Sequence, residues 1–322
     1  MRRRPPMILA ALGAVSVGAL TAVQARMNGG LGSESGDGIL AAFVSFGTGL
    51  LILVVAAPLT SAGRDAMRRL FAGVRGRSLP SWMLLGGLAG ALTNATQGLT
   101  VGLLGVSLFT VGVVAGQTVG GLVLDRVGYG PAGVVPVTMR RVAGGALALV
   151  AVGIGLAGGS LASVPWWMLS LPFLAGAGIS WQQATNGRLR QRVDSAFAAT
   201  FVNFLGGTVI LGVAAAVHIA VVGPPASLPT NPWLYLGGAT GVVYIFVSAG
   251  LVRYTGVLLL GLGSVVGLLA TSVVLDAVWP TDAELDVARA LIAVAVALVG
   301  VFVVVMPRRR APGGPGGAVP RR

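Results

Sequence analysis

The chain has 322 residues, of which 55% are apolar and only 10% are charged, and it contains 51 glycines. Apolar residues and glycine together make up about seven tenths of the chain, against about half in an ordinary globular protein. The formal net charge of +13 comes from arginine alone, because the chain has no lysine. This composition excludes an ordinary soluble enzyme and predicts an all-α polytopic membrane protein.

Ten apolar runs, each bounded by charges, proline or glycine, predict ten transmembrane helices. In chain order they are expected near residues 7–24, 39–59, 82–100, 104–124, 142–161, 164–183, 196–222, 232–251, 256–278 and 288–306. The long basic stretch between the second and third runs is interpreted as a loop.

The arginines fall almost entirely on one side of this predicted topology. If the N-terminus is cytoplasmic, 20 of the 22 arginines are cytoplasmic, and only Arg26 and Arg289 lie outside. This bias follows the positive-inside rule and predicts a multi-pass protein of the cytoplasmic (inner) membrane with both termini in the cytoplasm. Arginines placed in this way orient helices in the membrane. The lipid bilayer is therefore the expected partner, and no nucleic-acid partner is expected.

The sequence contains an internal repeat. Shifting it by 158 residues places NGGLGSESGDGILAAFVSFGTG on NGRLRQRVDSAFAATFVNFLGG, and a shift of 151 places WMLLGGLAG on the segment that begins at Trp233. Because each unit has five predicted helices, an odd number, the two units enter the membrane in opposite orientations. We therefore expect a basic N-terminal tail at 1–6, inverted repeats at 7–161 and 162–306, and a disordered basic tail at 307–322.

The basic N-terminus followed by an apolar run also fits a signal peptide with a cleavage site near Gln24. Removal of this segment would separate the first helix from its repeat unit. Since Gln24 and Asn28 have counterparts at Gln182 and Asn186, a retained helix is favoured.

The motifs MNGGLG…AAFVSFGTG, WMLLGGLAGAL, VAGQTVGGLVLDRVG and MRRVAGG resemble those of the drug/metabolite transporter superfamily, and within it the YdcZ-like membrane proteins, here as two tandem copies. The resemblance covers residues 7–306 and weakens in the second copy, where Leu268 replaces Gln117 and Trp279 replaces Gly128. It implies a ten-helix inner-membrane carrier of the EamA-like architecture that exports small molecules.

Glycines repeat every four residues in the fourth and ninth predicted helices, at Gly112, Gly116 and Gly120 and at Gly263 and Gly267. Such seams let helix backbones approach closely. We expect helices four and nine to pack together at the symmetry axis or to form a homodimer contact.

Polar side chains at membrane depth are the candidates for substrate binding, since each must find a partner or line a cavity. They gather in helices three, four, seven and eight, and Trp181 adds an aromatic ring that can stack on a substrate. The candidates are Asn94, Gln97, Gln117, Tyr244, Ser248, Asn203 and Trp181. Hydrogen bonding between helices without substrate contact is the alternative for each of them.

A second group of residues is a candidate for gating or coupling. Asp125 and Asp276 end helices four and nine, and Arg140 or Arg141 and Arg289 begin the helices that follow, so each half can form an ion pair that is structural or part of a gate. Gln24 and Gln182 lie where the first and sixth helices are expected to end. There the neighbouring Asn-Gly pairs favour helix capping over a gating contact.

Catalytic and metal-binding patterns are absent from the sequence: it has no cysteine, one histidine and no phosphate-binding loop. No enzyme activity and no cofactor are expected. The leading hypothesis is a secondary transporter that moves a small organic solute, a metabolite or a drug, by alternating access. The alternative is a non-transporting membrane scaffold or lipid-interacting protein.

Overall fold

The computed structural model describes residues 7–155, 170–225, 227–278 and 287–306, and all regular structure in these segments is helical. The expected tails at 1–6 and 307–322 lie outside the described residues. The helices are α1 (Met7–Ser35), α2 (Gly38–Leu59), α3 (Ser61–Arg75), α4 (Gly86–Arg126), α5 (Met139–Gly155), α6 (Ser170–Val193), α7 (Ala196–Val222), α8 (Gly237–Val278) and α9 (Val287–Val305), with short 3-10 turns at Ser81–Leu84 and Pro232–Leu236.

The prediction of an all-α polytopic membrane protein is confirmed. By length and composition, α1, α2, α7 and the segment Pro232–Leu275 are each long and apolar enough to cross a membrane. At 41 and 42 residues, α4 and α8 would each extend about 60 Å if straight, about twice the apolar thickness of a bilayer. Each therefore supplies two spans. The spans of α4 correspond to the third and fourth predicted helices, and those of α8 to the eighth and ninth.

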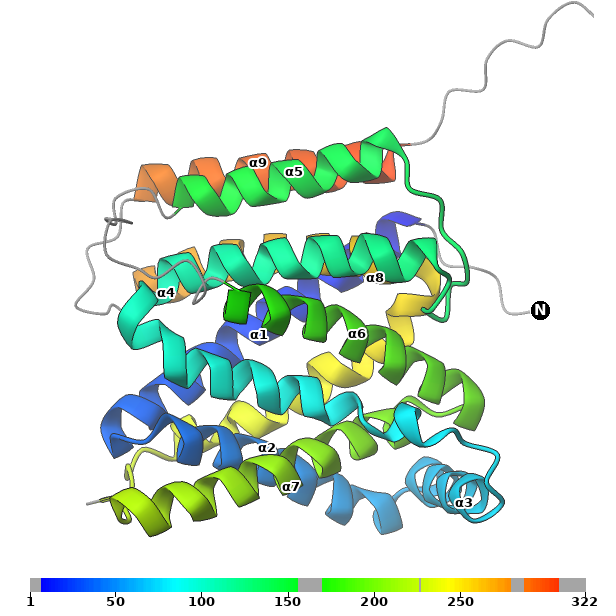
Figure 1. Ribbon diagram of the computed structural model, residues 1–322, viewed down its shortest axis with the longest axis vertical. Helices are drawn as coiled ribbons and strands as arrows, with labels where there is room; N and C mark the ends of the chain where they lie inside the picture. The colour runs from blue at the N-terminus through cyan, green and yellow to red at the C-terminus, as the bar shows by residue number, and fades with distance from the viewer. Residues whose placement is uncertain (1–6, 156–169, 226, 279–286, 307–322) are drawn as a thin grey trace, which may run out of the picture.

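The two long helices turn back at opposite ends of the molecule (Figure 1). In α8 the turn is a backbone break at Gly256, whose φ of 73° lies in the left-handed region that glycine adopts readily. The matching residue at a shift of 151 is Gly105, and α4 is helical through it. An inverted repeat requires the two long helices to turn back at opposite ends of the molecule, as they do here.

Helices of the two halves interlock. The N-terminal helix of each half packs against the last span of the long helix in the other half, α1 against α8 and α6 against α4, while α5 pairs with α9 and α2 with α7 (Figure 1). The repeat units are thus parts of one packed bundle.

Helices four and nine, which are the last spans of α4 and α8, are in contact as predicted, but their glycine rows do not form that contact. A Cβ atom on Gly116 would lie 1.8 Å from the carbonyl oxygen of Phe173 in α6, and one on Gly267 would lie 1.8 Å from that of Val15 in α1. Each glycine row lets a helix of the other half approach instead. Because these rows are used inside one chain, they give no basis for the expected homodimer.

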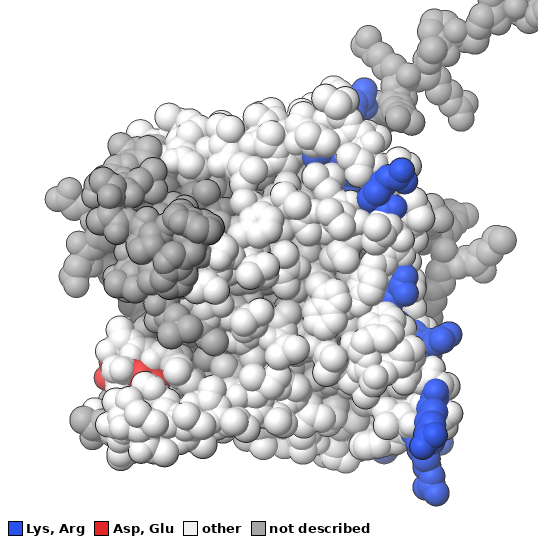
Figure 2. Space-filling view, in the orientation of Figure 1, with Lys and Arg blue, Asp and Glu red and all other residues white. Residues whose placement is uncertain are grey.

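The arginines gather along one edge of the bundle, and acidic residues show at the opposite edge (Figure 2). We call the first edge the Arg-rich end; it holds α3, the end of α4, the start of α5 and the end of α6. The basic stretch predicted to be a loop is helical in α3, because its apolar residues dock onto α6 and α7.

Candidate functional site

Helices α1 and α6 both run past the residues that were expected to cap them. Gln24 and Asn28 lie inside α1, which continues to Ser35, and Gln182 and Asn186 lie inside α6, which continues to Val193. The capping interpretation is wrong: the following residues find packing partners, as Gly30 does at Leu234, so the Asn-Gly pairs do not stop the helices. The four side chains are instead available inside the bundle.

In the second half, three buried side chains form a polar group that we call the α6 cluster: Gln182, Asn186 and Asn203. The Nε2 of Gln182 donates to the Oδ1 of Asn203 at 2.8 Å, and the Nδ2 of Asn186 donates to the same oxygen at 3.0 Å. The Nδ2 of Asn203 and the Oδ1 of Asn186 are buried and have no hydrogen-bond partner. The cluster thus holds one unused donor and one unused acceptor.

The repeat places a second polar group, the α1 cluster, in the first half. It consists of Gln24, Asn28 and Ser45, the counterparts of the α6 cluster at a shift of 158. Gln24 and Ser45 are buried, and the Oδ1 of Asn28 and the Oγ of Ser45 have no hydrogen-bond partner. The two halves therefore carry matched polar groups that differ at one residue.

Glycines of the opposite half complete each cluster. A Cβ on Gly86 would lie 2.3 Å from the Oδ1 of Asn186, and one on Gly237 would lie 2.2 Å from the Oδ1 of Asn28. Both glycines belong to the repeated WxxxGGxxG motif. The motif thus leaves room for an amide side chain against the helix backbone, and each cluster is built from both halves.

An aromatic pair is related by the same repeat. The rings of Phe46 and Phe204, which also correspond at a shift of 158, lie 5.3 Å apart between centroids. Phe46 packs against Gly90 beside Gln182, and Phe204 packs against Gly241 beside Gln24. The pseudo-twofold axis passes between the rings, and each ring links one half to the polar cluster of the other.

A buried carboxylate ties α4 to α5 and α8. Asp125 is 1% exposed and forms an ion pair with Arg141, so the expected pairing of this half is confirmed. The carboxylate also accepts hydrogen bonds from the backbone N–H groups of Val257 at 2.8 Å and Leu258 at 3.2 Å. Asp125 therefore caps the N-terminus of the second arm of α8, a favourable place for a negative charge.

The sequence analysis missed this cap. A Cβ on Gly256 would lie 2.9 Å from the Asp125 carboxylate, so glycine meets both the conformation and the space that the cap requires. The only signal in the sequence was a glycine just before a long apolar run. The counterparts Asp276 and Arg289 lie in α8 and α9, and their side chains are outside the described part of the chain.

A cationic side chain stacks on two aromatic rings at the Arg-rich end. The guanidinium carbon of Arg188 lies 5.0 Å from the ring centroid of Tyr129 and 5.8 Å from that of Trp82. Arg188 also donates to the carbonyl oxygen of Gly128 at 2.8 Å. This contact, which sequence reasoning also missed, joins the end of α6 to the segment that follows α4.

The residues expected to line a pocket between helices three, four and eight are only partly brought together. Asn94 donates to the carbonyl oxygen of Gly90 at 2.8 Å and Ser248 to that of Ile245 at 3.0 Å, so each bonds its own helix instead of a shared lining. Tyr244 packs between two apolar clusters. Trp181 is half-buried beside Gln182 on α6, and the Gln97 side chain is outside the described residues.

Gln117 lies at the contact between the last spans of α4 and α8. Its amide faces Gly261, where a Cβ would be 3.1 Å from Nε2, and its backbone carbonyl accepts a hydrogen bond from Ser180 at 2.8 Å. The space between Gln117, Thr118 and Leu258 is too small to hold a water molecule. At this contact the two helices pack directly against each other and leave no room for a solute.

Comparison with known families decides the relationship. A family model described as "Putative inner membrane exporter, YdcZ" matches residues 9–154 and again residues 166–303. The chain belongs to the YdcZ family. Its two matches are the two repeats, so the YdcZ unit occurs here twice in one chain, and the family description points to export across the inner membrane.

The fold itself has a solved relative. A chain described as "Crystal structure of protein" superimposes with a TM-score of 0.62 at 15% sequence identity, over 92% of this chain and 95% of the other. At this identity the likeness shows the fold alone. No curated protein matches this YdcZ-family chain in sequence.

Proposed function

We propose that this protein is a secondary transporter that exports small organic solutes from the cytoplasm by alternating access, with both termini in the cytoplasm. The family description and the inverted duplication support the transport role. The distribution of arginines supports the orientation, with the Arg-rich end facing the cytoplasm.

The observation that carries the proposal is the pair of polar clusters. Each contains buried amide or hydroxyl atoms without a hydrogen-bond partner, and such a group costs about 1–3 kcal/mol of stability in a protein interior. A purely structural helix bundle gains no stability from burying polar atoms without partners at the same place in both halves. A transporter uses such atoms when a polar solute supplies the missing partner.

The geometry suits alternation because each cluster contains residues of both halves. A relative rocking of the halves about the Phe46 and Phe204 contact would open one cluster while it closed the other. In this proposal Gln182, Asn186 and Asn203 bind solute near the Arg-rich end, and Gln24, Asn28 and Ser45 bind it near the opposite end. Gln117 and Tyr244 are proposed to line the path between them, together with Asn94, Gln97, Ser248 and Trp181.

The Asp125 cap is proposed as the gate at the Arg-rich end. Opening this end would require Asp125 to release Arg141 and the two backbone N–H groups of α8 together. In the inverted half, Asp276 and Arg289 are proposed to act in the same way at the opposite end. Transport by this route requires neither a cofactor nor a catalytic residue.

Transport by purified protein in vesicles tests the proposal. Efflux and uptake of a broad panel of metabolites and drugs would be measured in proteoliposomes with an imposed pH gradient. The variant is Asn203→Leu, and the control is Ser195→Ala, which changes the half-buried N-cap residue of the same helix, α7. At least one solute should move, and Asn203→Leu should slow it at least tenfold at equal expression. Failure of every solute to move would favour the membrane-scaffold alternative.

A reporter fused at Ala311 tests the orientation separately. A cytoplasmic signal is expected. A periplasmic signal would contradict the proposed topology, whatever the transport assay shows.

A further inference from the structure

Helix α3 lies across the Arg-rich end of the bundle. Figure 1 shows α3 end-on while the spans run across the view, so α3 is roughly perpendicular to them and parallel to the membrane plane. It starts directly after α2, where the Oγ1 of Thr60 accepts a hydrogen bond from the N–H of Gly63 at 3.0 Å. A helix in this position lies at the level of the lipid headgroups.

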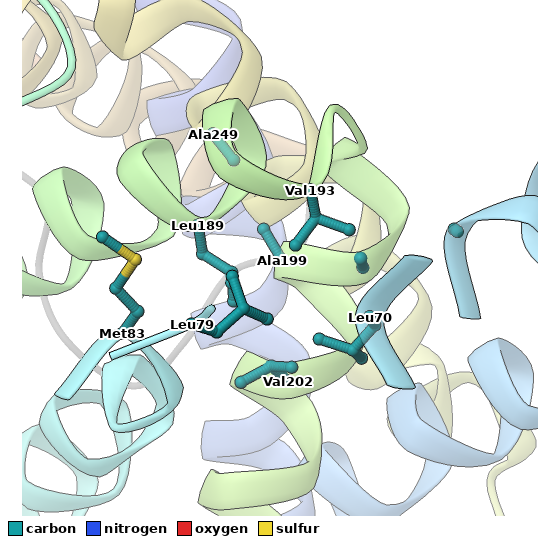
Figure 3. Packing of buried hydrophobic residues seen from close by; sticks show 10 residues of the cluster. Leu70, Leu79, Met83, Leu189, Val193, Ala199, Val202 and Ala249 are labelled. Carbon is teal, nitrogen blue, oxygen red and sulfur yellow. The ribbon is translucent and has the colours of Figure 1, made fainter. Parts of the chain in front are cut away.

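One face of α3 is anchored to the protein. Ala66 and Leu70 are buried in a cluster with Leu189 and Val193 of α6 and with Val202 of α7 (Figure 3). This contact joins the first half of the chain to the second. It also fixes which side of α3 faces away from the bundle.

The edge beside the anchored face is apolar and exposed. Phe71 is 64% exposed and Val74 is 44% exposed, and together with the partly buried Met67 they follow the spacing of one helix face. At 100° per residue, the next strip around the helix holds Arg64, Arg68 and Arg75, all exposed. The apolar edge and the row of arginines therefore run side by side.

The charge of this region is strongly positive. Between residues 61 and 79 there are five arginines and one acidic residue, Asp65, which forms an ion pair with Arg68. Arg64 donates to the carbonyl oxygen of Pro58 at 2.6 Å and is held where α2 ends. The row of cations is thus fixed at the point where a span leaves the membrane.

We propose that α3 is an interfacial helix that binds anionic phospholipid in the leaflet at the Arg-rich end. Phe71 and Val74 enter the acyl-chain region, and Arg64, Arg68 and Arg75 contact lipid phosphates. An apolar edge flanked by arginines on a helix parallel to the membrane is the arrangement by which amphipathic helices bind anionic membranes. Because α3 contacts both halves, bound lipid stabilises the packing of α3 on α6 and α7. The inference does not depend on the proposed transport activity.

Site-directed labelling tests the placement, and the absence of cysteine from the chain makes single-cysteine variants specific. A spin label at Val74→Cys should collide more with oxygen, which concentrates in lipid, than with a water-soluble nickel chelate. The matched control is Ala72→Cys, exposed on the opposite side of α3, which should show the reverse preference. Equal and water-like accessibility at both sites would overturn the proposal.

Thermal unfolding in nanodiscs tests the lipid specificity. Replacing phosphatidylcholine by a mixture with one third phosphatidylglycerol should raise the Tm of the parent protein. The variant Arg68→Gln/Arg75→Gln should lose at least half of that rise, whereas Arg126→Gln, which removes an exposed charge at the end of α4, should keep it. Equal losses in both variants, or the same rise with soluble inorganic phosphate, would refute lipid binding by α3.

Discussion

The α6 cluster and the α1 cluster share a glutamine, an asparagine, two glycines from the opposite half and a phenylalanine, but they differ at one residue. Asn203 accepts hydrogen bonds from both Gln182 and Asn186, whereas its counterpart Ser45 has a hydroxyl without a partner. The asparagine side chain is long enough to reach the amides of Gln182 and Asn186. A serine at the same position is too short to reach the corresponding amides of the first half. The second half thus has an internally bonded cluster, and the first half keeps its amides unlinked.

The Asp125 cap occupies the same end as the bonded cluster. Gly256 breaks α8 there and Asp125 caps the new helix start, while α4 is helical through the matching Gly105. Two halves with matched residues therefore adopt different local structures. A transporter that alternates between two states requires such an asymmetry in each of them. The following substitutions test it, from the largest expected effect to the smallest.

The largest effect is expected at the close helix contacts that both halves share. Gly116→Leu and Gly267→Leu should each abolish accumulation of folded protein, because a Cβ at either position already overlaps a backbone carbonyl. Size-exclusion chromatography of a fluorescent fusion would measure the folded fraction. Gly153→Leu and Gly250→Leu, where no atom lies within 4 Å of the added Cβ, should behave like the parent.

The next largest effect is expected at the buried ion pair. Asp125→Ala should lower the free energy of unfolding by about 3–5 kcal/mol, because it leaves Arg141 buried without its partner. The double variant Asp125→Leu/Arg141→Leu should lose less than the sum of the two single changes in a denaturant titration. Additive losses would show that the two charges do not act as a pair.

Exchanging the residue that distinguishes the clusters should have a smaller effect. Asn203→Ser should lower the free energy of unfolding by about 1–3 kcal/mol, since two buried amides lose their acceptor. The reverse change, Ser45→Asn, should be neutral or stabilising because it offers Gln24 and Asn28 the same acceptor. If the two changes shift stability equally and in the same direction, the clusters are not equivalent sites.

The smallest effect on stability is expected at Gln117, whose repeat counterpart is Leu268. Gln117→Leu should change the free energy of unfolding by less than about 1 kcal/mol, because an apolar side chain at the equivalent depth is already part of the fold. Transport should nevertheless fall if the amide contacts solute. Unchanged transport at equal expression would remove Gln117 from the path.

Much of the fold follows from the sequence. The apolar runs predict the spans because an unpaired backbone is too costly in lipid for anything but helices, and the repeat predicts the inversion because five is odd. The pairing of Asp125 with an arginine at the start of the next helix also follows from the sequence, and the structure decides for Arg141 over Arg140. Gln24 and Gln182 stand out because the repeat places one on the other, although the sequence predicted them at helix ends and not inside the bundle.

Other features depend on partners that are distant in the chain. The Asn-Gly pairs at Asn28 and Asn186 would stop an isolated helix, yet α1 and α6 continue because packing against the other half outweighs local propensity. The glycine rows predict close contacts but not their partners, because a row of small residues fits any helix that can reach it.

The break at Gly256 and helix α3 illustrate the same division. Glycine permits a positive φ anywhere, but only the Asp125 carboxylate, more than a hundred residues earlier, makes a break at Gly256 favourable. The basic segment of α3 is too short and too polar to be stable alone, and it is held by Leu189, Val193 and Val202. Local composition determined which segments enter the membrane, and contacts between the halves decided where those helices bend, end and meet, because the free energy of such contacts exists only when both partners are in place.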